Sequence, residues 1–180
     1  MVRPLVLAAL TAAGIAAASP LAAQVAPRVV VRMRPFTAPI VLDTLARTHD
    51  VDGTPSAVLG AAVGAFESFK IKAEVVDSGR GIVANLKFVK SGSLAGVQLS
   101  RFVNCGTGIT GPNADGSRVT LAIAVLVDPL SGSRARFGIA VVGSAINMTG
   151  SSVEPNACLS TGVLEEKLAD IITNRLASGS

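Results

Sequence analysis

From Ile71 onward the hydrophobic pattern changes to a period of two, and five segments up to residue 146 are predicted to be strands. They are 71–77, 82–89, 94–103, 118–127 and 134–146. This period is typical of β-strands, because successive side chains of a strand point to opposite faces. The links between most of these segments are short and turn-like, namely 77–81, 91–93 and 128–133. Parallel neighbours need a crossover of a dozen or more residues, so the pattern predicts an antiparallel sheet.

A helix is predicted directly before these segments. Thr54–Pro55 is a good helix start, because a hydroxyl caps the first N–H groups and proline suits the first helical position. Apolar residues then recur at helical spacing up to residue 69, at Leu59, Val63, Phe66 and Phe69.

A second helix is predicted over residues 162–176, with Ser160 or Thr161 as its cap. Two glutamates in its first turn and Arg175 in its last turn match the helix dipole. Its apolar residues share one face, and they are Leu164, Leu168, Ile171, Ile172 and Leu176. This face is expected to pack on the sheet.

The region before the first helix is less regular. Residues 28–33 form a short β-branched run that predicts a strand, ended by Arg34–Pro35. One or two helical turns are predicted over 40–48, and the composition of 49–53 predicts a loop.

Together these elements predict an α+β fold. One curved antiparallel sheet of five to six strands is packed by an N-terminal-side helix and a C-terminal helix, in a helix-grip-like arrangement. We expect residues 24–180 to form one domain. Within it, 24–53 is an N-terminal strand with a proline-containing connection, and 54–180 is the α+β part.

Residues 1–23 have the layout of a secretory signal peptide. Arg3 supplies a positive charge, residues 5–18 are apolar, and Pro20 precedes the small pair Ala22–Ala23. The alternative is an uncleaved membrane anchor, but an anchor needs about 20 strongly apolar residues and this segment is rich in alanine. We therefore expect cleavage after Ala23 and an exported protein, periplasmic or extracellular, with no transmembrane segment after signal removal.

Cys105 and Cys158 are the two cysteines of the chain. In an exported protein they have one possible internal pairing, and closing a loop of this size stabilises the fold by about 4 kcal/mol. Two cysteines and one distant histidine cannot supply four tetrahedral metal ligands, and neither cysteine belongs to a C-x-x-C pair. The prediction is a structural disulfide, Cys105–Cys158.

The composition argues against several classes of function. The chain is 49% hydrophobic and 16% charged, as expected of a protein that forms a core. Aromatic residues make up 3%, all of them Phe, which disfavours surfaces that stack on sugars or unpaired bases. The net charge of +4 is scattered along the chain, so we predict no nucleic-acid partner.

A glycine-rich stretch satisfies the consensus sequence of a dinucleotide-binding loop. Residues 106–111 read G-x-G-x-x-G, but a dinucleotide site needs this loop to open a helix whose N–H groups face the pyrophosphate. Here Pro112–Asn113 and Asp115–Gly116 follow, and then a predicted strand. We predict a glycine-rich turn beside the disulfide and no cofactor.

His49 is the single histidine, and its neighbours Asp50 and Asp52 suggest a catalytic triad or a metal site. The chain has no G-x-S-x-G elbow and no S-x-x-K pair to accompany it. Asp43, Asp50 and Asp52 could hold a weak extracellular Ca²⁺, although the full calcium-loop pattern is missing. Paired carboxylates for glycoside chemistry are conceivable among Glu67, Glu74, Asp77 and Asp115. The default interpretation of residues 49–53 is a polar surface loop, and we predict no catalytic set.

Two blocks of sequence carry a resemblance. LSRFVNCGTGITGPNADGSRVTLAIAV (99–125) and CLSTGVLEEKLADII (158–172) resemble a family of uncharacterised secreted or periplasmic bacterial proteins, which brings no assigned activity. More locally, VLGAAVGAF followed by IKAEVVDSGRGIVAN is similar to helix-grip modules of outer-membrane assembly lipoproteins. Those proteins carry a lipidated cysteine that is missing here.

Three hypotheses of function follow. The first is a non-enzymatic envelope or secreted domain that acts through contact with another envelope protein or as a structural element. The second is binding of a lipid or another apolar small molecule between the sheet and the C-terminal helix, because 118–127 and 134–146 are apolar on both faces. The third is a hydrolase that uses His49 with a nearby aspartate.

Overall fold

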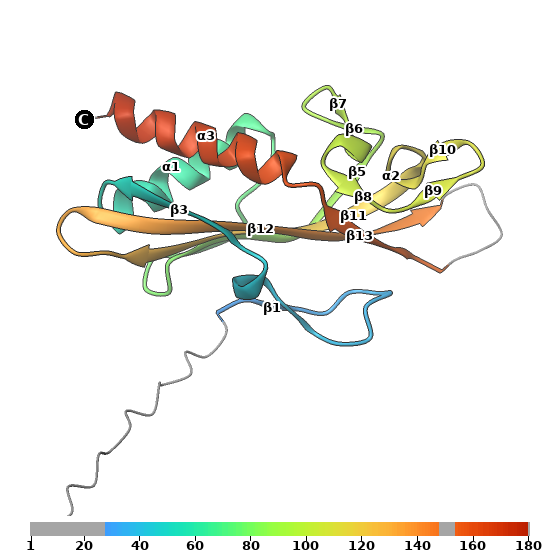
Figure 1. Ribbon diagram of the computed structural model, residues 1–180, viewed down its shortest axis with the longest axis horizontal. Helices are drawn as coiled ribbons and strands as arrows, with labels where there is room; N and C mark the ends of the chain where they lie inside the picture. The colour runs from blue at the N-terminus through green and yellow to red at the C-terminus, as the bar shows by residue number, and fades with distance from the viewer. Residues whose placement is uncertain (1–27, 148–153, 180) are drawn as a thin grey trace, which may run out of the picture.

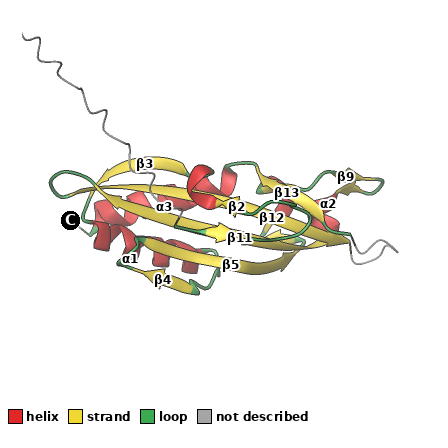
Figure 2. Cartoon of the chain, turned by 90° about the horizontal axis from the view of Figure 1, so that it is seen from below, coloured by secondary structure: helices red, strands yellow, loops and turns green. Residues whose placement is uncertain are grey.

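An antiparallel sheet forms the centre of the computed structural model, which describes residues 28–147 and 154–179. Six strands follow one another in the order β4-β5-β11-β12-β13-β8, and β3 pairs with β12 as a seventh strand (Figures 1 and 2). Their bounds are β3 Arg47–Asp52, β4 Val75–Asp77, β5 Ile82–Ser91, β8 Val103–Asn104, β11 Ser117–Pro129, β12 Arg134–Asn147 and β13 Asn156–Ser160. The predicted antiparallel sheet is confirmed.

The two longest strands, β11 and β12, form the middle of the sheet. They pair along their whole length, from Ser117 opposite Asn147 to Pro129 opposite Ala135. Every residue from Leu121 to Val127 is buried. A run without exposed residues means that both faces of this strand are covered.

Two helices cover one face of the sheet, α1 (Pro55–Ser68) and α3 (Val163–Ser178) (Figure 1). The Thr54 hydroxyl accepts a hydrogen bond from the Ala57 N–H at 3.2 Å, so the predicted cap is confirmed. At the start of α3, the hydroxyls of Ser160 and Thr161 accept the N–H groups of Gly162 and Val163. Both helices are found where the spacing of apolar residues predicts them, and with the sheet they confirm the α+β fold.

The opposite face of the sheet is covered by the N-terminal segment, which we define as residues 28–46 (Figure 1). It contains β1 (Val30–Val31), β2 (Ile40–Val41) and the 3₁₀ turn η1 (Leu42–Thr44). Its buried residues pack against the sheet in a second core cluster: Val29, Val31 and Leu42 with Ile82, Ala84, Ala122, Ala124, Leu126, Ala140 and Val142.

The expected strand over 94–103 is wrong. These residues belong to a hairpin of β6 (Ser93–Leu94) and β7 (Val97–Gln98), the 3₁₀ turn η2 (Leu99–Arg101) and β8. Ala95 and Gly96 have φ values of 50° and 79°, which form the tight turn of that hairpin. The apolar side chains that suggested a strand, Leu94, Leu99 and Phe102, are buried in the core under the helices.

Two further expectations are corrected, and one strand was not expected. Of the helical turns predicted over 40–48, only the three-residue η1 forms, and the predicted loop at 49–53 is mostly strand β3. β13 is a strand that the sequence pattern did not predict. Both strands pair beside β12, β3 with residues 134–139 and β13 with residues 142–145. Both strands lie at the margin of the sheet and carry polar side chains, so they lack the apolar pattern from which a strand is predicted.

None of the described helices is long and apolar enough to span a membrane. The predicted signal peptide, residues 1–23, lies outside the described residues.

Candidate functional site

The disulfide joins Cys105 and Cys158, as predicted, with an S–S distance of 2.00 Å. Cys158 lies in β13, and Cys105 follows β8, which pairs with β13. The cross-link therefore fastens two short strands at the margin of the sheet.

The glycine-rich stretch after Cys105 is a hairpin of β9 (Thr107–Gly108) and β10 (Gly111–Pro112), followed by the single helical turn α2 (Asn113–Gly116). The Asn113 side chain donates to the carbonyl of Cys105 at 3.1 Å, and its N–H donates to the carbonyl of Gly106 at 3.0 Å. Asn113 therefore holds the loop closed on itself, and no long helix starts there.

A polar cavity of about 420 Å³ lies beside this loop. Its polar side chains come from Gln98, Thr110, Asn113, Asp115, Ser117 and Asn147. Asp115 accepts both the N–H of Ser100 at 2.8 Å and its hydroxyl at 2.7 Å. The carboxylate and the Asn113 amide are thus engaged in holding the loop.

His49 does not meet the aspartates beside it in sequence. Its ring stacks on Phe137, with centroids 5.2 Å apart, on the helix-covered face of the sheet. Asp50 and Asp52 point to the other face, because consecutive residues of a strand alternate. Asp50 binds Arg136 at 2.6 Å and Asp52 binds Arg134 at 3.4 Å. The arrangement is a pair of cross-strand ion pairs, and it does not form a triad.

The three aspartates considered for calcium do not converge either. Asp43 accepts hydrogen bonds from the N–H groups of Arg28 and Val29 and from the Arg28 guanidinium. Burial raises the pKa of Asp43, but these hydrogen bonds outweigh it and hold the pKa below its ordinary value. Among the described residues, no group of three or more His, Cys, Asp or Glu side chains could hold a metal ion.

The space between the sheet and α3 is filled by side chains. Leu164, Leu168 and Ile172 of α3 are fully buried in the same core cluster as Phe137 and Ile139 of β12. The space in which the sequence suggested an apolar ligand is therefore filled by side chains of the protein's own core.

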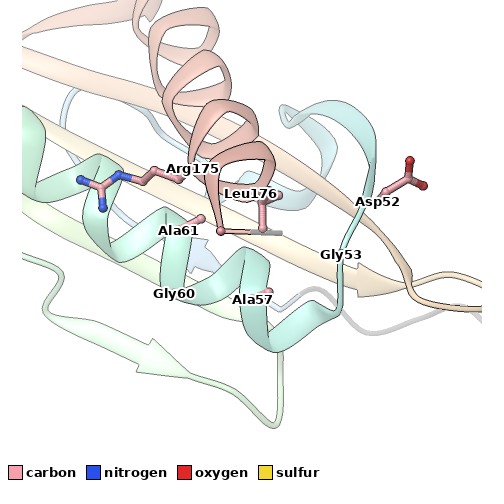
Figure 3. A pocket seen from close by; sticks show the side chains of 8 residues that line it. Asp52, Gly53, Ala57, Gly60, Ala61, Arg175 and Leu176 are labelled. Atoms are coloured by element: carbon pink, nitrogen blue, oxygen red, sulfur yellow. The ribbon is translucent and has the colours of Figure 1, made fainter.

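A shallow groove lies at the other end of α3, between its last turn and α1 (Figure 3). It measures about 340 Å³, and its walls are small or apolar residues: Gly53, Ala57, Gly60, Ala61, Leu176 and Gly179. Figure 3 shows the Arg175 side chain along α1 and the Asp52 carboxylate pointing away from the groove. The two charged groups at its ends therefore do not converge on a common ligand.

Glu165 is a buried acid that the sequence interpretation missed. Its exposed fraction is 4%, and its Oε2 atom has no hydrogen-bond partner. Burial raises the pKa of Glu165, although the Ser160 hydroxyl and the nearby Arg47 oppose this effect. Its position in the helix could have revealed the burial. Glu165 lies three and seven positions before the buried Leu168 and Ile172, so it shares their face of the helix.

One outer edge of the sheet is formed by β4 and β5, and we call it the open edge. β4 pairs with β5 only through Ile82 to Ala84. Beyond Ala84, no strand of the described chain pairs with this side of β5, as Figure 2 shows for the short β4 beside the longer β5. Two apolar side chains of the edge are more than half exposed, Val76 at 57% and Val89 at 52%.

The strand register directs backbone groups of the open edge outward. The N–H of Val127 donates to the carbonyl of Gly81, so odd-numbered residues of β11 bond toward β5. The even-numbered Thr120 therefore forms its backbone hydrogen bonds with β12. Val89 lies opposite Thr120, so the N–H and C=O of Val89 point away from β11. A row of such groups is a template for pairing with another chain.

Comparison with known proteins yields no match: no family model, no curated protein and no solved structure is similar to this chain. The resemblances drawn from the sequence blocks therefore stay predictions.

Proposed function

We propose that this protein is an exported domain of the bacterial envelope or of a secreted protein, that it has no catalytic step of its own, and that it acts by contact with another protein. The contact surface we propose is the open edge, and its occupant is an extended segment of the partner.

Export is supported by two features at different levels. The first residues have the layout of a signal peptide, and the Cys105–Cys158 disulfide is a bond typical of oxidising compartments outside the cytoplasm.

The observation that carries the contact function is the outward-facing backbone of β5 next to an exposed apolar side chain. Val89 presents an N–H, a C=O and a half-exposed isopropyl group where no described strand covers them. Addition of a strand to such an edge is a recurring mode of peptide recognition, in which main-chain hydrogen bonds supply the affinity.

The two other hypotheses find less support in the packing. An apolar ligand between the sheet and α3 would have to displace Leu164, Leu168 and Ile172 from the core. A hydrolase that uses His49 would need an acid beside the imidazole, whereas Asp50 and Asp52 lie on the other face of β3 and bind arginines.

The test is photo-crosslinking in the source bacterium. A photoreactive amino acid at position 89 is expected to give one adduct of discrete mass, whereas the same group at the exposed Lys167 of α3 gives none. Ser91 lies opposite Arg118, an even-numbered residue of β11, so its N–H also points away from β11. The substitution Ser91→Pro removes this N–H and should abolish the adduct. Equal adducts from positions 89 and 167, in protein with native melting behaviour, would contradict the proposal.

A further inference from the structure

Resting on this proposed function, we infer that the partner segment that binds the open edge is an acidic extended chain. The inference comes from the charges beside the unpaired half of β5.

The unpaired half of β5 is lined by lysines. Lys87 and Lys90 belong to it, and Lys72 lies next to it, because the Asn85 side chain donates to the Lys72 carbonyl at 2.9 Å. None of these three lysines has an ion-pair partner among the described residues. Three cations along one short edge repel one another and attract carboxylates.

The acidic residues of this edge lie at its other end. The N–H of Glu74 donates to the carbonyl of Ala84 at 3.0 Å, and Asp77 pairs with Ile82, so both belong to the half of β5 that β4 covers. Both acids therefore lie beside the covered half of β5, where Arg80 of the β4–β5 turn accompanies them, whereas the charged residues beside the open half are lysines.

The bulge in β5 supports the same interpretation. The pairing with β11 shifts register between Leu121 and Ile123, opposite Phe88 and Asn85. The Asn85 carboxamide accepts the N–H of Lys87 at 3.1 Å, which satisfies the extra residue of the bulge internally. Pairing groups of Val89 beyond the bulge stay available, flanked by Lys87 and Lys90.

Lysines on an edge strand also have a purely protective use, because they discourage pairing between copies of the same protein. The two interpretations differ in one respect. Protection predicts that every extended peptide is rejected, whereas recognition predicts that an acidic peptide is accepted and a basic one is refused.

The experiment uses two synthetic peptides, one that alternates Glu with Val and one that alternates Lys with Val. Binding to the full mature protein is measured by fluorescence anisotropy, and the site is located by hydrogen exchange of the Val89 amide. We expect the Glu–Val peptide to bind at least about tenfold more tightly, to slow exchange at Val89, and to weaken as salt is added.

The matched variants are Lys87→Glu on the edge and Lys167→Glu on α3, which make the same change of charge at exposed positions. The first should reduce binding of the Glu–Val peptide several-fold, and the second should leave it unchanged. Equal losses in both variants mean general charge attraction and overturn the inference.

Two other outcomes also overturn it, and they separate it from the proposed function. If both peptides slow exchange at Val89 equally, the edge binds strands without selecting acidic ones, and the contact function stands. If neither peptide slows exchange at Val89, the acidic partner is rejected, and the crosslinking at position 89 then decides the contact function alone.

Discussion

At the scale of single residues, the most unusual group is Glu165. A carboxyl that is 4% exposed with one unsatisfied oxygen carries a penalty for ionisation, because water no longer solvates the charge. The Ser160 hydroxyl and the Arg47 guanidinium reduce this penalty without removing it, since the pKa of Glu165 remains raised.

The raised pKa has a defined effect on stability. A group whose pKa is higher in the folded state contributes stability that is complete below its unfolded pKa, about 4.3, and is lost as pH rises through the folded pKa. We expect the free energy of unfolding of the native protein, relative to Glu165→Gln, to decrease over this range of rising pH. The measurement is urea unfolding of both proteins at several pH values.

Glu166→Gln is the matched control for that series, because Glu166 is the neighbouring residue and is exposed. If the difference in free energy of unfolding between the native protein and Glu165→Gln stays constant across the pH range, the raised pKa of Glu165 is contradicted.

Lys70 occupies a backbone position that favours glycine, with φ of 56° directly after α1. Its N–H bonds to the Glu67 carbonyl, and the N–H of Ile71 bonds to the Phe66 carbonyl, which is the hydrogen-bond pattern of a glycine-type helix end. Lys70→Gly should raise the free energy of unfolding by about 0.5–1 kcal/mol, as measured by chemical denaturation. The control Lys72→Gly, outside this turn, should not raise the free energy of unfolding. A lower free energy of unfolding in Lys70→Gly would contradict the glycine-type helix end.

At the scale of elements, the disulfide end of the sheet depends on covalent support. β8 has two residues and β13 has five, and Cys105–Cys158 is adjacent to their pairing. Strands this short contribute few hydrogen bonds, so the cross-link contributes much of their stability.

Removal of the disulfide tests this dependence. The double variant Cys105→Ser, Cys158→Ser should lose about 4 kcal/mol of unfolding free energy, because the unfolded chain regains the freedom of a loop of 53 residues. Chemical denaturation measures the loss, and reduction of the native protein should reproduce it. A variant as stable as the oxidised protein would show that β8 and β13 are held by packing alone.

Elements with strong periodicity were predictable, and marginal ones were not. α1 and α3 carry apolar residues at helical spacing, and β11 and β12 carry long apolar runs, because these elements are buried over most of their length. β3 reads RTHDVD, and its aspartates form ion pairs across to β12, so nothing in its own composition indicates a strand. The pairing with β12 is a long-range contact that local patterns do not contain.

At the scale of the whole molecule, the sheet is closed on both faces. The helices cover one face, and the N-terminal segment covers the other, where Val29, Val31 and Leu42 are buried. Arg28 fastens this segment, because its guanidinium binds Asp43 at 3.0 Å and Asp128 at 2.9 Å.

Asp43→Asn should loosen the N-terminal segment. The carboxylate accepts three hydrogen bonds from Arg28 and Val29, and a neutral amide loses their charge-assisted part, so we expect a loss of about 1–3 kcal/mol at neutral pH. Because the pKa of Asp43 is lowered, this difference from the native protein should disappear as pH falls through that pKa.

Chemical denaturation gives the loss, and hydrogen exchange at Val29 and Val31 locates it. The control is Asp52→Asn, whose side chain is 96% exposed and which should change stability little. Similar effects at positions 43 and 52 would show that the Arg28 contacts do not hold the segment.

By itself, the sequence determined the α+β class, both helices, the central hairpin of β11 and β12 and the cysteine pairing, because each of these follows from local periodicity or from a single possible pair. The tertiary structure alone decided which face each polar residue occupies. It separates His49 from Asp50, buries Glu165 and leaves the lysine-lined half of β5 uncovered. These outcomes depend on which strands, far apart in the sequence, pair with each other and in which register. Local sequence patterns do not determine this pairing.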